Sequence, residues 1–355
     1  MKSILIKNGR VWDGEKFFYA DVFAENGIVT KIEKDILCKA DFEYDASGKI
    51  VSAGFVDAHV HLKGISPDNL GEECDVISFP FGVTAVADAS AVQGNSDLLD
   101  SLCAKVVVFA SVEIKNNRTC FENAEKMLTM YGKDVCGLKV YFDDKMQEVY
   151  DIKPLAEVVE FADKNKLKVM VHSSNSPVDM QTVMNVLRRG DIISHIYHGG
   201  NNKVSDDKFE CMKYAKKHEI ITDVAFAGNV HTDFPTFSDA LKFGCVPDVI
   251  SSDITKWSAC KRGGNYGLTM CMSMAKILGM SEEDIFSSVT KNPAEALGKD
   301  SEWGFLKVGK CADIAVTEYA DEGFDLSDKT GKRIFSNCGY RNVLTISNGK
   351  IVYKF

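Results

Sequence analysis

The chain has 355 residues, of which 45% are hydrophobic, and it carries a formal net charge of −9. This length is enough for one large barrel, alone or with a small second domain. The negative charge argues against nucleic acids and membrane surfaces as partners, because phosphate binding needs a basic face, although a local basic pocket could still bind a small anion.

The two ends of the chain are predicted to form short strands. Apolar and alternating runs there are separated by Asn-Gly pairs, which are typical of tight turns, at positions 8–9, 26–27 and 348–349. Because a different pattern fills the middle of the chain, we expect residues 1–50 and 303–355 to pair into one small sheet domain.

The middle of the chain, residues 51–302, alternates apolar strand-like runs with longer amphipathic stretches. Eight strands alternating with helices predict an α/β fold of the (β/α)₈ TIM-barrel type. A doubly wound sheet is the alternative, but no glycine-rich phosphate loop follows the first strand. The expected strands cover residues 50–59, 84–89, 106–111, 137–142, 168–172, 192–195, 220–225 and 248–253, and helices are expected over 154–165, 176–189 and 205–218 among others.

The first expected barrel strand ends in a His-Val-His motif. Residues two apart on a strand point to the same face, so His59 and His61 can reach one metal ion while Val60 faces away. A chance pair of surface histidines is the alternative. The motif, however, follows the apolar run IVSAGFVDA and so lies at the carboxyl end of a buried strand, where barrel enzymes carry their active sites.

A lysine, Lys139, lies inside the apolar stretch GLKVYF of a later strand. A lysine in such a strand is costly unless its charge is paired or chemically changed. On its own, Lys139 would be interpreted as a snorkelling or salt-bridged side chain. Beside metal-binding histidines a second interpretation gains weight, in which the amine reacts with CO₂ to give an anionic carbamate that bridges two metal ions.

Three further candidate ligands, His172, His195 and Asp253, end later strands. One histidine at a strand end is more often a hydrogen-bonded structural residue than a ligand, but two at successive strand ends after a His-x-His pair indicate a metal centre. Asp253 can bind metal and also accept a proton from water. His198 and His231 lie in loops after the sixth and seventh strands, where they could contact substrate or simply be exposed.

In this order the residues resemble the amidohydrolase superfamily, and most closely its deacetylase/dihydroorotase-like branch. The resemblance covers nearly the whole chain and is carried by AGFVDAHVHL, GLKVYF, MVHSSNSP, RRGDIISHIYHGGNN, PDVISSD and VTKNPAEALG. The stretch WGFLKVGKCADIAV is similar to the family's return into its β-sandwich. The resemblance therefore implies a small β-sandwich domain from residues 1–50 and 303–355 beside a metal-dependent hydrolase barrel over 51–302.

The resemblance also implies a centre of two divalent metal ions, for which zinc is the usual metal. The His-x-His pair and Asp253 would hold the more buried ion, and His172 and His195 the more exposed one. Lys139, modified to N6-carboxylysine, would bridge the two ions. Manganese, iron and cobalt stay open as alternatives, because imidazole and carboxylate ligands suit several divalent ions.

The chain departs from this branch at three substrate-facing positions. Lys63 stands where dihydroorotases carry an arginine, and a lysine cannot reproduce the bidentate guanidinium contact with a substrate carboxylate. Phe226 stands where the deacetylases tend to carry a histidine after the seventh strand. The family's Phe-Asn-Gly after the sixth strand is here Tyr197-His198-Gly199. Lys63 argues against dihydroorotase activity itself, and the three departures together limit what the resemblance implies about the substrate.

We therefore expect a metal-dependent hydrolase that cleaves an amide C–N bond of a small N-acyl amino acid or cyclic amide. A hydroxide that bridges the ions would attack the carbonyl carbon, with Asp253 as general acid and base. The loop after Asp253 carries Lys256 and Arg262, which could bind a substrate carboxylate, as could Lys63 and His198. A solvated basic loop is an equal alternative.

Three other functions stay open for the chain. They are a mononuclear deaminase of the same superfamily, an ester hydrolase, and a catalytically silent relative that serves as a scaffold. Such deaminases lack the bridging lysine, so Lys139 argues against the first. Silent relatives usually lose metal ligands, and all six positions are filled here.

Cysteine usage and the N-terminal segment predict the compartment. The 11 cysteines include no C-x-x-C pair, which indicates reduced thiols. The first apolar run is interrupted by Lys7 after four residues and is too short for a signal peptide. We expect a cytoplasmic homo-oligomer that acts on a small-molecule substrate and binds neither nucleic acid nor a membrane.

Overall fold

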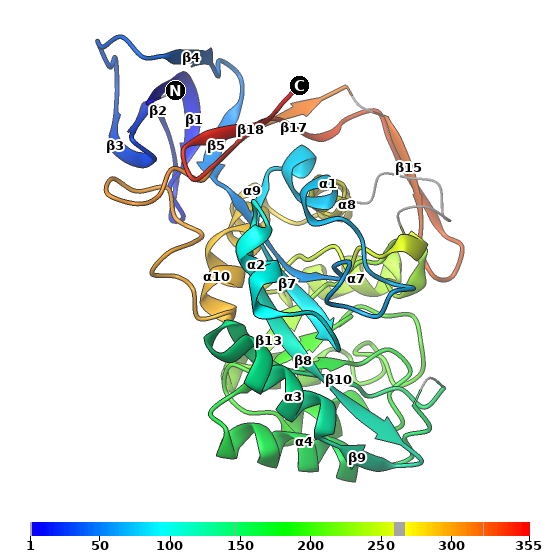
Figure 1. Cartoon of the computed structure of the whole chain (residues 1–355). Helices are drawn as coiled ribbons and strands as arrows, with labels where there is room; N and C mark the ends of the chain where they lie inside the picture. The colour runs from blue at the N-terminus through cyan, green and yellow to red at the C-terminus, as the bar shows by residue number, and fades with distance from the viewer. Residues whose placement is uncertain (1, 146, 259–266, 322) are drawn as a thin grey trace.

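The computed structural model describes residues 2–145, 147–258, 267–321 and 323–355. Its centre is a sheet of seven parallel strands that follow one another in chain order (Figure 1). Val249 bridges to Asp223 and Ile254 bridges to Val60, both in parallel, so the segment between them leads from the last strand back to the first. The sheet therefore curls in a TIM-barrel-like α/β fold. Its strands are β6 (Phe55–Val60), β7 (Val83–Ala91), β8 (Lys105–Lys115), β10 (Val135–Tyr141), β11 (Lys168–His172), β12 (Ile192–Ser194) and β13 (Ile221–Asp223), and β9 (Arg118–Cys120) pairs antiparallel with β8.

Helices cover the outside of this sheet, as a parallel sheet buried on both faces requires. All nine residues of β7 are buried. Elsewhere in the sheet, helix α4 is an example of a helix that covers barrel strands. Its buried residues Leu155, Val158, Val159 and Ala162 recur with a helical period and face β10 and β11. The helices are α1 (Cys74–Ser78), α2 (Ser96–Ser101), α3 (Glu122–Tyr131), α4 (Lys153–Lys164), α5 (Met180–Val186), α6 (Glu210–Lys217), α7 (Phe234–Lys242), α8 (Leu268–Leu278), α9 (Glu282–Val289) and α10 (Lys291–Ala296), with short 3-10 helices η1 (Phe79–Phe81), η2 (Gly132–Asp134) and η3 (Gly228–Val230).

The two ends of the chain pair in one eight-stranded sheet, which has an apolar core of its own. We call it the terminal sheet. Its order is β18-β17-β14-β5-β1-β2-β3, with β4 beside β1. A two-layered sandwich and the exact domain boundaries stay predictions. The strands are β1 (Ser3–Trp12), β2 (Phe17–Glu25), β3 (Ile28–Glu33), β4 (Phe42–Asp45), β5 (Ile50–Ala53), β14 (Ile314–Ala320), β17 (Gly339–Ser347) and β18 (Lys350–Lys354).

The predicted strand over 50–59 is in fact two strands in different sheets. β5 pairs with β1 and β14 of the terminal sheet, whereas β6 begins the barrel. Gly54 lies between them, where a Cβ atom would come within 2.2 Å of Thr84 Oγ1. Only glycine allows this close approach, and the chain changes sheets there.

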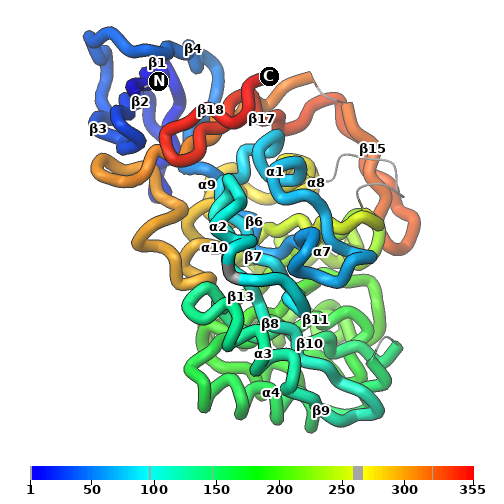
Figure 2. The backbone as a smooth tube through the Cα atoms, in the orientation of Figure 1, coloured from blue at the N-terminus to red at the C-terminus, as the bar shows by residue number. Residues whose placement is uncertain are grey.

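A hairpin of β15 (Phe324–Ser327) and β16 (Arg333–Ser336) follows the first C-terminal strand of the terminal sheet. It runs down the side of the molecule toward α7 (Figure 2). Its turn contacts the barrel, because Phe234 N donates to Asp328 Oδ2 at 3.0 Å and Lys329 N donates to Thr232 O at 3.0 Å. A segment from the end of the chain thus reaches a barrel loop.

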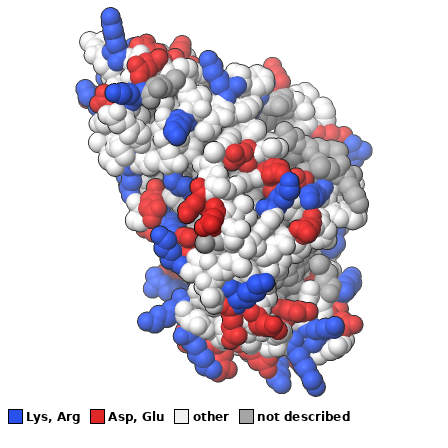
Figure 3. All heavy atoms as spheres, in the orientation of Figure 1, with Lys and Arg blue, Asp and Glu red and all other residues white. Residues whose placement is uncertain are grey.

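The surface carries both signs of charge. Acidic and basic side chains are interspersed over the face drawn in Figure 3. No helix in the described part of the chain is long and apolar enough to cross a membrane.

Candidate metal centre

Three predicted ligands, His59, His61 and Asp253, meet at the carboxyl end of β6. Each offers one ligand atom, and these atoms lie within 4.8 Å of one another. Asp253 Oδ1 is 3.1 Å from His61 Nε2 and 3.4 Å from His59 Nε2. The backbone explains this meeting, because Asp253 N donates to His59 O at 2.8 Å. We call these three residues the first ligand group.

The other ring nitrogens of the first ligand group are held by buried polar side chains. His59 Nδ1 lies 3.4 Å from Asp223 Oδ2, and His61 Nδ1 lies 3.0 Å from Ser66 Oγ and 2.9 Å from Ser90 Oγ. Burial raises the pKa of Asp223 to about 6. Such partners orient metal-binding imidazoles by fixing one nitrogen and leaving the other free toward the ion.

Lys139 is fully buried beside the first ligand group. Its Nζ lies 3.1 Å from His59 Nε2, and burial lowers the pKa of Lys139 to about 8. Among the described residues no carboxylate lies within 4.0 Å of this amine. A simple salt bridge therefore does not explain the buried lysine, and its amine is held partly toward the neutral form, which is the form that reacts with CO₂.

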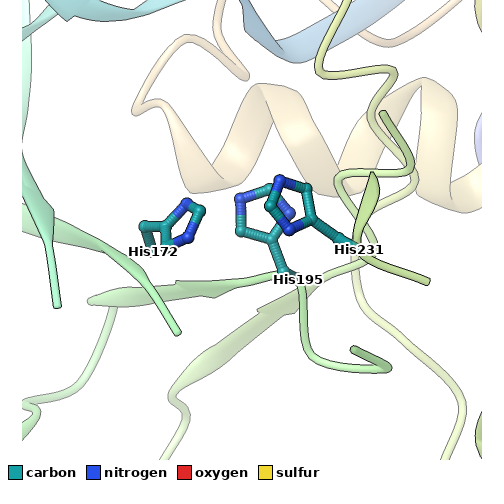
Figure 4. Close-up of side chains that lie close together, drawn as sticks. All are labelled: His172, His195 and His231. Carbon is teal, nitrogen blue, oxygen red and sulfur yellow. The ribbon is translucent and has the colours of Figure 1, made fainter. Parts of the chain in front are cut away.

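A second ligand group consists of His172, His195 and His231, whose ligand atoms also lie within 4.8 Å of one another. His172 ends β11 and His195 follows β12, whereas His231 comes from the loop after η3. The ring of His231 is 3.9 Å from that of His195 and 5.0 Å from that of His172, and all three rings converge (Figure 4). The rings of His59 and His195 are 5.4 Å apart, so the two groups adjoin.

His231 was not predicted as a ligand. The sequence held one signal for it, since the deacetylase-like resemblance implies a histidine at the position of Phe226, and His231 follows five residues later. Ala227 and Gly228, which lie between these two positions, have positive φ angles of 48° and 63° and turn the chain there. From this turn the side chain of His231 reaches the rim of the barrel beside His195.

The donor set fits divalent metal ions. His172 Nε2 is buried without a hydrogen-bond partner in the described structure, and its nearest carboxylate oxygen, Asp143 Oδ2, lies 3.6 Å away. Burial lowers the pKa of His172 and lowers those of His195 and His231 well below the usual value, so these rings stay neutral. Neutral imidazoles with one carboxylate are ligands that zinc and similar ions prefer.

Both ligand groups line one cavity of about 210 Å³. Its remaining walls are mostly apolar, and no lysine or arginine lines it within the described ranges. The lining residues outside the two groups are Leu70, Tyr141, Ala227, Val230, Thr255 and Trp257.

The predicted substrate-binding lysines lie outside this lining. Lys63 is exposed and pairs with Glu73, and Lys256 Nζ donates to Asp68 O at 2.7 Å. Arg262 lies outside the described residues. A role for each of them in substrate binding stays a prediction.

His198 is fully buried and does not line the cavity. Its Nδ1 accepts a hydrogen bond from Gly200 N at 3.1 Å, and it forms an isolated antiparallel bridge with Thr232, next to His231. Burial lowers the pKa of His198 to about 3. Its contact with substrate stays a prediction, and its bridge to Thr232 joins the loop after β12 to the loop that carries His231.

The sequence profile of the amidohydrolase family matches residues 50–352. The chain belongs to the amidohydrolase family. A curated relative of this amidohydrolase, a deacetylase of Enterococcus faecalis, is 25% identical over 332 residues, covering 86% of this chain and 87% of the relative. A dihydroorotase of Ligilactobacillus salivarius is 22% identical over 435 residues, covering 99% of each chain.

Solved structures agree with this assignment at the level of the fold. A dihydroorotase crystal structure matches the amidohydrolase with a TM-score of 0.87 at 19% identity, covering 100% of this chain and 98% of that chain. An adenine deaminase crystal structure matches with a TM-score of 0.87 at 22% identity, covering 100% of both. The predicted family is thus confirmed, and the family and its curated relatives support a metal-dependent hydrolase that acts on C–N bonds.

Proposed function

We propose that this amidohydrolase is a two-metal hydrolase that cleaves the amide C–N bond of a small N-acyl amino acid or cyclic amide. The observation that carries the proposal is the meeting of two adjoining ligand groups at one cavity, with buried Lys139 beside the first. The barrel over 51–302 would supply the chemistry, and residues 1–50 with 303–355 would form a β-sandwich domain beside it.

Each ligand group would hold one ion, for which we propose zinc, and Lys139 would bridge the ions as N6-carboxylysine. When bound, such ions polarise a carbonyl oxygen and lower the pKa of water. The carbamate is supported by the complete burial of Lys139 with no carboxylate of the described residues in ion-pair distance. A carbamate would supply the negative charge that two cations in a buried site require.

Asp253 lies where the two ligand groups join. Its Oδ1 faces the first group, and its Oδ2 lies 3.9 Å from His195 Nε2 and 3.8 Å from His231 Nε2. A carboxylate at this point can take a proton from the attacking water and deliver it to the leaving nitrogen. We therefore assign to Asp253 the role of general base and then general acid.

The cavity supports a small substrate. Its volume of about 210 Å³ lies below the usual range for drug-sized ligands, roughly 300–1,000 Å³. Leu70, Val230 and Trp257 would contact an apolar part of the substrate, while the scissile amide faces the ligand groups. Small N-acyl amino acids and five- or six-membered cyclic amides fit this description.

The substitution Asp253→Asn tests the catalytic role. We expect kcat to fall by about 10²-fold or more, because the amide cannot move the proton, while most of the bound metal is retained. Asp239→Asn, on the exposed face of α7, serves as the matched control and should behave like the wild type. Near-normal turnover of Asp253→Asn would remove the assigned role.

A substrate panel tests the reaction class. N-acetyl D- and L-amino acids, cyclic amides and the corresponding esters are offered to zinc-loaded protein, with release of acetate, opened ring or alcohol as the readout. Ammonia release from adenine-like rings by a protein with one ion per chain would favour a deaminase instead. Metal binding without turnover of any compound would favour a silent scaffold.

A further inference from the structure

One histidine of the metal centre comes from a loop and not from a strand end. His231 follows η3, and its side chain is 13% exposed, whereas the other four histidines of the two ligand groups are almost completely buried. Figure 4 shows its ring facing those of His172 and His195. The ordinary ligand order of His-x-His, Lys, His, His and Asp has no place for it.

We propose that His231 is an additional protein ligand of the ion held by His172 and His195, an inference that rests on the two-metal function proposed above. Ser174 Oγ lies 2.8 Å from His231 Nδ1, and Ala225 O lies 2.9 Å from His195 Nδ1. Both rings are therefore fixed through the same nitrogen, in the way that metal-binding histidines are usually held.

The free nitrogens of these two rings converge on the same place. His195 Nε2 and His231 Nε2 lie 3.9 Å and 3.8 Å from Asp253 Oδ2. The ligand atoms of His172, His195 and His231 all lie within 4.8 Å of one another, close enough for small side-chain rotations to bring them to one ion. This arrangement is typical of a metal ligand: Nδ1 of His231 is fixed by Ser174, and Nε2 is left toward the other two histidines.

The loop that carries His231 is held on both sides. Gly199 N donates to His231 O at 2.9 Å, which ties it to the loop after β12. On the other side, the β15–β16 hairpin binds the residues that follow His231, through Lys329 N to Thr232 O and Phe234 N to Asp328 Oδ2.

Asp328 is the centre of this second attachment. It is 2% exposed, and its Oδ1 accepts hydrogen bonds from Thr330 N at 2.8 Å and Lys332 N at 2.9 Å. The carboxylate therefore shapes the hairpin turn and holds the His231 loop with its two oxygens. We assign to Asp328 the role of a positioning residue for His231.

The experiment is a Zn²⁺ titration of metal-free protein in competition with a chromophoric chelator. Wild-type protein should bind two ions in two steps. His231→Ala should bind the first ion with unchanged affinity and the second about 100-fold or more weakly. Asp328→Asn should weaken the second step by about 10-fold, because the ligand is kept but less well held. Thermal midpoints and a second variant, His231→Asn, show that the effect is not a loss of folding.

Two matched controls belong to this titration. His218→Ala removes a histidine that stacks on Tyr214 in α6, and Asp325→Asn removes a carboxylate of the same hairpin that pairs with Arg333. Both should titrate like the wild type. Two wild-type affinities in His231→Ala would overturn the inference and leave the proposed function intact, and a raised KM in that case would make His231 a substrate contact. Wild-type protein that binds no Zn²⁺ would overturn both.

Discussion

The two ligand groups lie at one cavity but are held by different means. The first group comes from the end of β6 and from the segment between Val249 and Ile254. It is buried, and the outer ring nitrogens of its histidines contact buried polar side chains. The second group combines two strand ends with a loop that a hairpin from the end of the chain holds in place. From this difference we expect metal binding at the second group, more than at the first, to depend on contacts from distant parts of the sequence.

Among the variants that should affect Zn²⁺ binding at one ligand group and not at the other, we expect the largest effect from Asp223→Asn. Asp223 lies behind His59 and accepts hydrogen bonds from Ser251 Oγ at 2.6 Å and Ser194 Oγ at 3.0 Å. Loss of its charge should weaken the binding of Zn²⁺ at the first ligand group by about 10- to 100-fold and leave binding at the second group unchanged. The two-step Zn²⁺ titration measures this. Equal weakening of both steps would mean that the groups are not independent.

We expect a smaller effect from the protonation of His198, which should make the free energy of unfolding depend on pH. Its pKa is about 3 in the folded protein and near 6.5 when unfolded, so below pH 6.5 the unfolded chain takes up a proton that the folded protein does not. Stability is therefore lost as the pH falls. At pH 5 this amounts to about 2 kcal/mol, or about 30-fold in the unfolding constant.

The variant His198→Asn isolates this contribution, because its side-chain oxygen can still accept from Gly200 N but does not titrate. Urea denaturation of metal-free protein at pH 7.5 and pH 5 should show the wild type losing about 2 kcal/mol more than the variant. Identical losses would mean that His198 is not buried as a neutral ring, and that the loops supporting the second group are open in the metal-free protein.

The smallest effect is expected from Lys63→Ala. The lysine is exposed, pairs with Glu73 at the surface and does not line the cavity, so its loss should change kcat/KM by about 2-fold or less. Glu73→Gln is the control, since it removes the same pair from the other side. A loss of 10-fold or more in Lys63→Ala alone would restore the predicted contact with a substrate carboxylate.

The part of the centre that lies on strands was predictable. Side chains two apart on a strand share a face, and parallel strands end at the same rim of a barrel, so the positions of His59, His61, His172 and His195 at or directly after strand ends predicted that they would meet. Asp253 was predicted at the end of an eighth strand over 248–253, but this prediction is wrong in the described structure, where the segment makes only isolated bridges to Asp223 and Val60 and forms no regular strand.

The loop-borne part was not predictable. A loop has no period that aims a side chain, and the position of His231 depends on tertiary contacts with Ser174 and with a hairpin about a hundred residues later. The split of the strand over 50–59 escaped prediction for a similar reason, since the run is continuously apolar. Only the close approach of Thr84 to Gly54 shows where it changes sheets.

Metal content per chain tests the central claim most directly. Wild-type protein and Lys139→Met, both grown with added zinc and dialysed against metal-free buffer, are analysed by plasma mass spectrometry. We expect two ions per chain in the wild type and at most one in Lys139→Met, whose side chain has a similar length but cannot carry a carbamate. Equal metal content in both proteins, or none in the wild type, would contradict a centre built around a modified Lys139.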